Sequence, residues 1–155
     1  MLTRDKTAVY YRVCVVYFDE YVVAGAPVCP PDVVFVLDDS GSIGSVNFVL
    51  AKTFLSRLVA RLNVGGCVTR IGLVKYSDNV NAHIYLNTYS SVASLQRAIL
   101  ALNYTGEGTY TASALAYVRT TILTSARGDR SNVSNVVVVL TDGKSSSTTN
   151  TRVSI

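Results

Sequence analysis

The chain has little of several residue types that would indicate catalysis or a thiol-based metal site. Its 155 residues include one histidine, His83, and three cysteines, Cys14, Cys29 and Cys67. His83 falls on a segment predicted to be an edge strand, so a Ser-His-Asp triad would have poor geometry. The cysteine spacing matches no C-x-x-C metal or redox motif. These scarcities argue against nucleophilic hydrolysis and against a thiol metal centre.

Charge and long apolar runs are also scarce. Only 15% of the residues are charged, the net charge is +4, and the basic residues are scattered singly. Nucleic-acid binding therefore has little support. No apolar stretch approaches the length of a membrane span, so we expect none. A chain that is 49% hydrophobic at this length is globular and fits a single domain.

Proline occurs only at positions 27, 30 and 31, and this cluster marks a boundary. We predict an N-terminal extension over 1–31 and a domain over 32–155. Within the extension, basic residues precede an apolar run from Ala8 to Phe18, which loosely imitates a signal peptide. Asp19 and Glu20 interrupt that pattern. A degraded signal and a short extra strand both fit.

Hydrophobic periodicity predicts alternating strands and helices. The expected strands are Val33–Leu37, Ile71–Ser77, Asn81–Leu86 and Val136–Leu140, and the expected helices are Val46–Leu62, Val92–Leu102 and Thr111–Ala126. This order predicts an α/β fold, doubly wound, with a mostly parallel sheet and helices on both faces. Because no further strand follows, the valine-rich last strand should present an unpaired edge, and the chain should be poorly soluble or marginally stable.

Oxygen-bearing side chains follow two of these strands. Asp38, Ser40 and Ser42 form D-x-S-x-S directly after the first strand, and Asp142 follows the last. Adjacent parallel strands bring their carboxyl ends to one sheet edge. Thr109, in a Gly-rich turn before a helix, adds another hydroxyl. Such hard oxygen donors suit Mg²⁺ or Mn²⁺. Singly, each segment is also explained as a turn or a helix N-cap.

The D-x-S-x-S motif, the turn with Thr109 and the segment with Asp142 follow one another along the chain in an order that resembles the von Willebrand factor type A domain. The resemblance covers roughly residues 32–150. The resemblance implies a Rossmann-like fold that continues beyond this chain with further helix–strand units. It also implies a metal ion-dependent adhesion site at Asp38, Ser40, Ser42, Thr109 and Asp142. There a Mg²⁺ or Mn²⁺ ion would accept a Glu or Asp carboxylate from a protein partner. Asp39 departs from the commoner Gly or Ser and should add negative charge.

The extracellular collagen VI and matrilin type of this family is the nearest resemblance. It implies a secreted adhesion module of the extracellular matrix, with collagen or another matrix protein as partner. A cytoplasmic scaffold of a complex is the alternative. A Mg²⁺-dependent phosphohydrolase fits less well, because such enzymes use D-x-D and Ser40 stands at the second acidic position. We therefore expect no enzymatic activity.

Other short motifs bear on the same question. Arg127, Gly128 and Asp129 form an RGD tripeptide that integrins recognise, although a helix end explains all three residues. Asn103 and Asn132 begin N-glycosylation sequons in expected loops. Family members often pair a cysteine at the position of Cys29 with one after the last strand, which this chain lacks. The odd count suggests a missing partner, and three buried thiols are the alternative.

Overall fold

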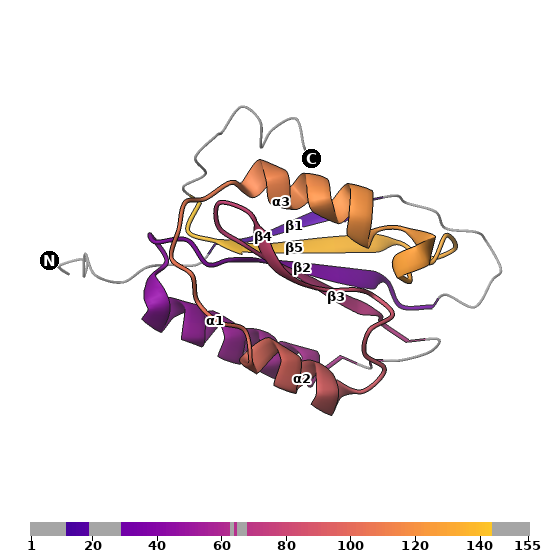
Figure 1. Ribbon diagram of the computed structural model, residues 1–155. Helices are drawn as coiled ribbons and strands as arrows, with labels where there is room; N and C mark the ends of the chain where they lie inside the picture. The colour runs from indigo at the N-terminus through magenta and orange to yellow at the C-terminus, as the bar shows by residue number, and fades with distance from the viewer. Residues whose placement is uncertain (1–11, 19–28, 63, 65–67, 144–155) are drawn as a thin grey trace, which may run out of the picture.

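The computed structural model describes residues 29–62, 64 and 68–143, together with the backbone of residues 12–18. A five-stranded sheet forms the centre of the molecule, in the order β1-β5-β2-β3-β4 (Figure 1). Its strands are β1 (Arg12–Phe18), β2 (Asp32–Asp38), β3 (Ile71–Tyr76), β4 (Val80–Ile84) and β5 (Asn135–Thr141). The three central strands are parallel, and the two edge strands pair antiparallel to their neighbours.

Helices cover both faces of this sheet. The helix α1 (Gly44–Val59) lies beside α2 (Val92–Leu100) on one face, and α3 (Thr111–Tyr117) lies on the other (Figure 1). A π-helical turn, η1 (Val118–Ile122), and a 3₁₀ turn, η2 (Ser125–Arg127), follow α3. The predicted doubly wound α/β fold is therefore confirmed, with parallel pairing confined to the central strands.

Two hydrophobic clusters sandwich the sheet, because alternate side chains of each strand point to opposite faces. Phe35 and Leu37 of β2 pack with α1 and α2, whereas Val34 and Val36 pack with α3 and η1. Every residue of β2 is buried. Burial on both faces explains why this strand reads as a continuous apolar run that ends where polar residues begin.

The prediction of an unpaired edge at the last strand is wrong. The structure pairs β1 antiparallel with β5 along seven residue pairs, from Arg12 with Thr141 to Phe18 with Asn135. The N-terminal run that the sequence left open is thus a strand over Arg12–Phe18. Its backbone supplies the hydrogen-bonding partner that the valines of β5 require, so the reason for expecting poor solubility disappears.

The prediction of one helix over Thr111–Ala126 is also wrong. Regular α-helix ends at Tyr117, and the wider π turn carries the chain to Ile122. Leu123 then leaves the helical region, with φ −82° and ψ 64°. The segment contains consecutive β-branched residues, Thr120 to Ile122, which are poor helix formers. The apolar spacing alone did not reveal this break.

Candidate metal centre

Asp38 ends β2 at the carboxyl edge of the sheet and is fully buried. Its Oδ1 accepts a hydrogen bond from the Ser40 backbone N–H at 2.9 Å, and its Oδ2 accepts one from the Thr141 hydroxyl at 2.6 Å. Burial raises the pKa of this carboxyl above its usual value of 3.8, and the nearby charge of Asp142 acts in the same direction. The two hydrogen bonds oppose the shift and fix the direction of the carboxylate.

The two serines of D-x-S-x-S turn their hydroxyls toward each other. Ser40 Oγ lies 3.2 Å from Ser42 Oγ, and Ser42 is exposed whereas Ser40 is buried. Gly41 stands between them, and a Cβ atom there would come within 3.1 Å of the Gly106 carbonyl oxygen. Glycine at this position therefore allows the loop of residues 103–110 to lie directly against the serines.

Several hydrogen bonds join the 103–110 loop to the loop that follows β2. The Tyr104 hydroxyl donates to the Ser40 carbonyl at 3.1 Å, and the Gly106 N–H donates to the Asp39 carbonyl at 3.1 Å. The Gly41 N–H donates to the Glu107 carbonyl at 2.7 Å. Thr109, buried to 6% exposure, lies on this attached loop just before α3.

Asp142 directly follows β5, which runs parallel to β2 with Leu37 paired to Leu140. This register brings Asp142 to the same edge as Asp38, in keeping with the charge interaction between the two carboxyls. Asp142 is half-buried, and the Gly143 N–H donates to the Thr141 hydroxyl at 3.1 Å. Thr141 thus connects the end of β5 to the Asp38 carboxylate.

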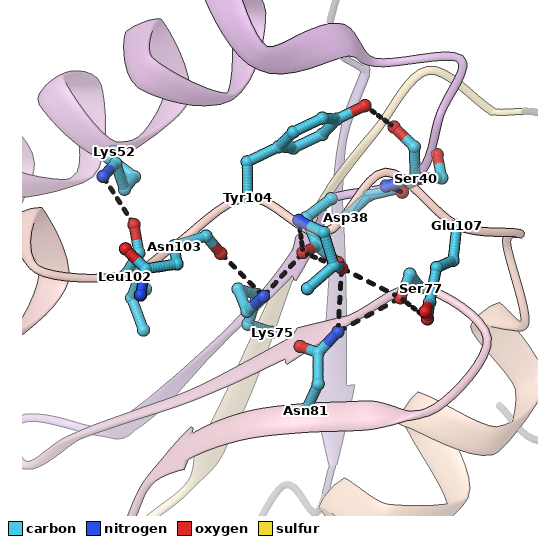
Figure 2. A network of polar contacts seen from close by, with 12 residues as sticks. Asp38, Ser40, Lys52, Lys75, Ser77, Asn81, Leu102, Asn103, Tyr104 and Glu107 are labelled. Atoms are coloured by element: carbon cyan, nitrogen blue, oxygen red, sulfur yellow. Dashed lines mark hydrogen bonds and ion pairs between the residues drawn. The ribbon is translucent and has the colours of Figure 1, made fainter.

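Beside this cluster, Asp39 and Lys75 form a buried ion pair. Lys75 Nζ lies 2.6 Å from Asp39 Oδ2, with side-chain exposures of 4% and 0%. Figure 2 shows Lys75 reaching from β3 toward the Asn103 carbonyl, to which it donates at 2.8 Å. The Thr105 hydroxyl and backbone N–H also donate to Asp39 Oδ2, at 2.6 and 3.1 Å. Lys75 therefore cancels the negative charge that we expected Asp39 to add.

Oxygen atoms dominate the donor set at this edge. The part of the chain that the structure describes holds no group of three or more His, Cys, Asp or Glu side chains suited to a metal ion. A cation there would depend on hydroxyls beside the two carboxylates, and hard cations accept such neutral oxygen ligands. The chemistry of the donors therefore fits Mg²⁺ or Mn²⁺ better than a metal that prefers nitrogen or sulfur.

Sequence reasoning missed the residues that hold this arrangement. Thr141 orients Asp38, and Lys75 and Thr105 anchor Asp39. Thr141 lies in the same T-D-G segment as Asp142, so that segment offered a signal. Lys75 and Thr105 belong to no motif, and no signal in the spacing would have identified them.

The RGD tripeptide closes the 3₁₀ turn η2. Gly128 has a left-handed φ of 96°, is buried, and accepts a hydrogen bond at its carbonyl from Arg70 at 2.7 Å. The Arg127 guanidinium stacks 4.1 Å over the Tyr85 ring. This geometry is that of a chain turn at a helix end. Integrin recognition stays a prediction, which cell attachment by an Asp129→Glu variant would test.

The remaining candidates lie at the surface or outside the site. Asn103 and Asn132 are both exposed in loops, so their glycosylation stays a prediction. His83 is exposed on β4, as expected, and its Nδ1 lies 3.3 Å from the Tyr117 hydroxyl. Cys29 is disulfide-bonded, so the alternative of three free thiols is wrong. The side chains of Cys14 and Cys67 lie outside the described residues.

The strand order and the polar loops at the carboxyl ends of β2 and β5 define an open α/β domain with its cluster of oxygen-bearing side chains at that edge. The chain belongs to the von Willebrand factor type A domain family, whose model matches residues 32–154.

Its relatives include proteins of the matrilin and collagen VI groups. Mouse matrilin-1 is 40% identical over 118 residues, a match that covers 74% of this chain and 24% of matrilin-1. The mouse collagen alpha-4(VI) chain is 38% identical over 133 residues, covering 82% of this chain and 6% of the collagen chain. The chain thus matches about a quarter of the length of the first and a small part of the second.

Solved structures with the same fold include proximal thread matrix protein 1 from the mussel byssus. One crystal form superposes with a TM-score of 0.73 at 23% identity, covering 82% of this chain and 34% of that one. Another structure of that protein has a zinc-occupied metal ion-dependent adhesion site (MIDAS) motif. It gives a TM-score of 0.60 at 24% identity, and the match covers 67% of this chain and 28% of that one. At these identities the likeness establishes the fold. No helix in the described residues is long and apolar enough to cross a membrane.

Proposed function

We propose that this chain is a metal-dependent adhesion module of the extracellular matrix, and that it binds a Glu or Asp carboxylate of a protein partner. Asp38, Ser40, Ser42, Thr109 and Asp142 would hold a Mg²⁺ or Mn²⁺ ion. When bound, the ion supplies an electrophilic centre that accepts a partner's carboxylate oxygen. Collagen or another matrix protein is the expected partner. No catalytic step is required of the chain.

The observation that carries this proposal is the orientation of Asp38. Its two oxygens accept hydrogen bonds from the Ser40 N–H and the Thr141 hydroxyl, at the edge where the Ser40 and Ser42 hydroxyls converge. A buried carboxylate with a raised pKa is costly to keep charged unless a positive group binds it. Because Lys75 is engaged with Asp39, a cation suits the place beside Asp38.

The extracellular location is supported by two independent features. Cys29 is disulfide-bonded, and disulfides persist in oxidising compartments. The matrilins and collagen VI chains to which this chain is similar are proteins of the extracellular matrix. A cytoplasmic scaffold, the alternative, would have to maintain this disulfide in a reducing environment, so we favour the secreted protein.

Calorimetric titration of Mg²⁺ and Mn²⁺ into chelator-treated protein tests the metal site. Ser42→Ala removes an exposed hydroxyl and should weaken binding by about tenfold or more. Ser45→Ala, an exposed serine in the first turn of α1, is the matched control and should bind as the wild type does. Equal binding by both variants, or none by the folded wild type, would count against the site.

Attachment to immobilised collagen in Mg²⁺ and in EDTA tests the partner separately. We expect attachment in Mg²⁺ that EDTA abolishes and that Ser42→Ala weakens. Attachment that EDTA leaves unchanged would contradict a metal-bridged contact. Metal binding without collagen attachment would contradict collagen as the partner and leave the metal site standing.

A further inference from the structure

Acidic residues are nearly absent from the middle of the chain. Residues 41–106 contain six basic residues and one acidic residue, Asp78. Asp78 lies in the turn between β3 and β4, against Gly108. Helices α1 and α2 come from the same stretch, and neither contains Asp or Glu. The helical layer that they form on one face of the sheet therefore carries basic residues without acidic ones (Figure 1).

Half of these basic side chains bind groups of the protein itself. Their contacts are Lys75 with Asp39, Arg70 with the Gly128 carbonyl, and Lys52 with the Leu100 and Leu102 carbonyls. The other three, Arg57, Arg61 and Arg97, are exposed. Within the described residues, the ion pairs are Asp39 with Lys75 and Asp32 with Arg130, so they do not involve these three arginines.

Arg57 and Arg97 point away from the sheet. Arg57 is two residues from both Leu55 and Val59, which pack in the core, and it therefore lies on the opposite side of α1. Arg97 has the same relation to the two buried residues of α2. Its Nε donates to the Ala93 carbonyl of the same helix at 3.4 Å, along the outer surface.

Contact between the two helices brings these arginines to one surface. Gln96 Nε2 donates to the Ser56 carbonyl at 2.8 Å, and these two residues directly precede Arg97 and Arg57 in the sequence. Arg61 follows Arg57 by about one helical turn, in the turn that continues α1. Arginines that are scattered along the sequence are thus gathered by the fold. We call the surface formed by Arg57, Arg61 and Arg97 the arginine surface.

We propose that the arginine surface binds a sulfated polysaccharide of the extracellular matrix, at a place separate from the candidate metal centre. A guanidinium group donates paired hydrogen bonds to the oxygens of tetrahedral anions such as phosphate, and sulfate presents the same arrangement of oxygens. A surface with positive charge and no carboxylate attracts polyanions. An arginine near a helix end also stabilises that end, but this role does not explain why acidic residues are absent from both helices.

The choice of a polysaccharide rests on the extracellular part of the proposed function and not on the metal. The matrilins and collagen VI chains to which this chain is similar are proteins of the extracellular matrix. Sulfated polysaccharides are the abundant polyanions of that compartment. Because three exposed charges form the contact, binding is reversible and weakens as the salt concentration rises.

Calorimetric titration of heparin oligosaccharides into the whole chain, in EDTA and at about 0.1 M salt, tests this surface apart from the metal centre. The wild type should bind heparin saturably. Arg57→Gln and Arg97→Gln should each raise the dissociation constant about threefold, and the double variant should raise it about tenfold. The double variant should also show a weaker dependence on salt, because fewer counterions are released on binding.

The matched control is Arg119→Gln, which removes one exposed positive charge from η1 on the other face of the sheet. This variant should bind heparin as the wild type does. All three arginines are exposed, so their replacement by glutamine should leave the free energy of unfolding nearly unchanged.

Three results would overturn the proposal. One is a folded wild type that does not bind heparin. Another is equal weakening by Arg57→Gln, Arg97→Gln and Arg119→Gln, since binding would then follow net charge and not this surface. The third is tighter binding of double-stranded DNA than of heparin, which would exclude a sulfated polysaccharide as the preferred partner. Because EDTA is present throughout, failure of the metal centre would not change any of these measurements.

Discussion

Asp39 and Lys75 form the strongest electrostatic contact near the candidate metal centre. Their charges are almost fully removed from water at a separation of 2.6 Å, and Asp39 Oδ1 is buried without a hydrogen-bond partner in the described structure. Such a pair contributes little net stability, yet removing only one of its two charges is strongly destabilising. Through Thr105 and Asn103 it also anchors the loop that carries Thr109.

Replacing Lys75 alone should therefore destabilise the folded protein strongly. We expect Lys75→Met to lower the free energy of unfolding by roughly 3–5 kcal/mol, because Asp39 is left as an unpaired buried charge. The double variant Asp39→Asn/Lys75→Met should recover a large part of that loss. Urea denaturation of the four proteins in this cycle measures the coupling. Additive losses would show that the pair does not act as a unit.

Asp38 should make the metal-free protein less stable as the pH rises. Burial raises its pKa in the folded state, so the folded protein holds this proton more tightly than the unfolded chain does. The associated stability is present below the usual carboxyl pKa and is lost as the pH rises through the raised value.

Asp38→Asn should remove the pH dependence of stability that the Asp38 carboxyl contributes. In EDTA, the stability of the variant relative to the wild type should increase as the pH rises above about 4, and saturating Mg²⁺ should stabilise only the wild type. Chemical denaturation across this pH range measures the difference. Parallel pH profiles would contradict the assignment of this cost to Asp38.

The sequence identified the residues that lie at strand ends and not those that support them. Asp38, Ser40, Ser42 and Asp142 could be found because an apolar run stops at each of these segments. The supporting contacts join residues far apart in the chain: 36 positions for Asp39 and Lys75, 66 for Asp39 and Thr105, and 103 for Asp38 and Thr141. Local spacing carries no information about contacts of that range.

At the scale of elements, the turn after η1 depends on one glycine. Gly128 adopts φ 96°, and a Cβ atom there would lie 2.7 Å from the Asn87 backbone nitrogen. The Arg127 carbonyl accepts the Asn87 N–H at 3.3 Å, which links the turn to the segment after β4. The turn is thus closed by backbone contact that leaves no room for a side chain.

Gly128→Ala should consequently be more destabilising than backbone strain alone explains. The matched control is Gly44→Ala, since Gly44 has φ 75° but no atom within 4 Å of an added Cβ. We expect the control to cost about 1–2 kcal/mol and Gly128→Ala to exceed it. Thermal or urea denaturation provides the comparison. Equal losses would mean that the Asn87 contact relaxes without cost.

Element types were predictable from sequence, whereas their ends and pairings were less so. The strands β2, β3 and β5 lie within one residue of the expected bounds because both of their faces are buried. The break within Thr111–Ala126 was missed, since a π turn keeps an apolar spacing close to that of an α-helix. The antiparallel partner of β5 was missed because apolar alternation does not specify which strand pairs with which.

At the scale of the whole molecule, contacts distant from the candidate metal centre stabilise the strands that carry it. The strand β1 covers the outer edge of β5, the strand that ends at Thr141 and Asp142. Asp32, at the start of β2, forms an ion pair with Arg130 at 2.7 Å, and Cys29 lies three residues before it in a disulfide. The ion pair joins the beginning of the domain to the segment that precedes β5.

Reduction of the disulfide should lower the free energy of unfolding while the central strands of the sheet stay folded. We expect a loss of about 2–4 kcal/mol in the free energy of unfolding, chiefly because the unfolded chain becomes less constrained. Denaturation with and without a thiol reductant measures it, and a Cys29→Ser variant should match the reduced protein. A variant that is as stable as the oxidised wild type would show that the bond contributes nothing.

One cation should bind at the carboxyl edge formed by β2 and β5. A crystal grown with Mn²⁺ and measured for anomalous scattering tests it most directly. We expect a single strong peak among the oxygens of Asp38, Ser40, Ser42, Thr109 and Asp142, with hydroxyl oxygens at about 2.1 Å. A peak elsewhere, or none at a Mn²⁺ concentration that saturates the protein in solution, would contradict a metal site at this edge.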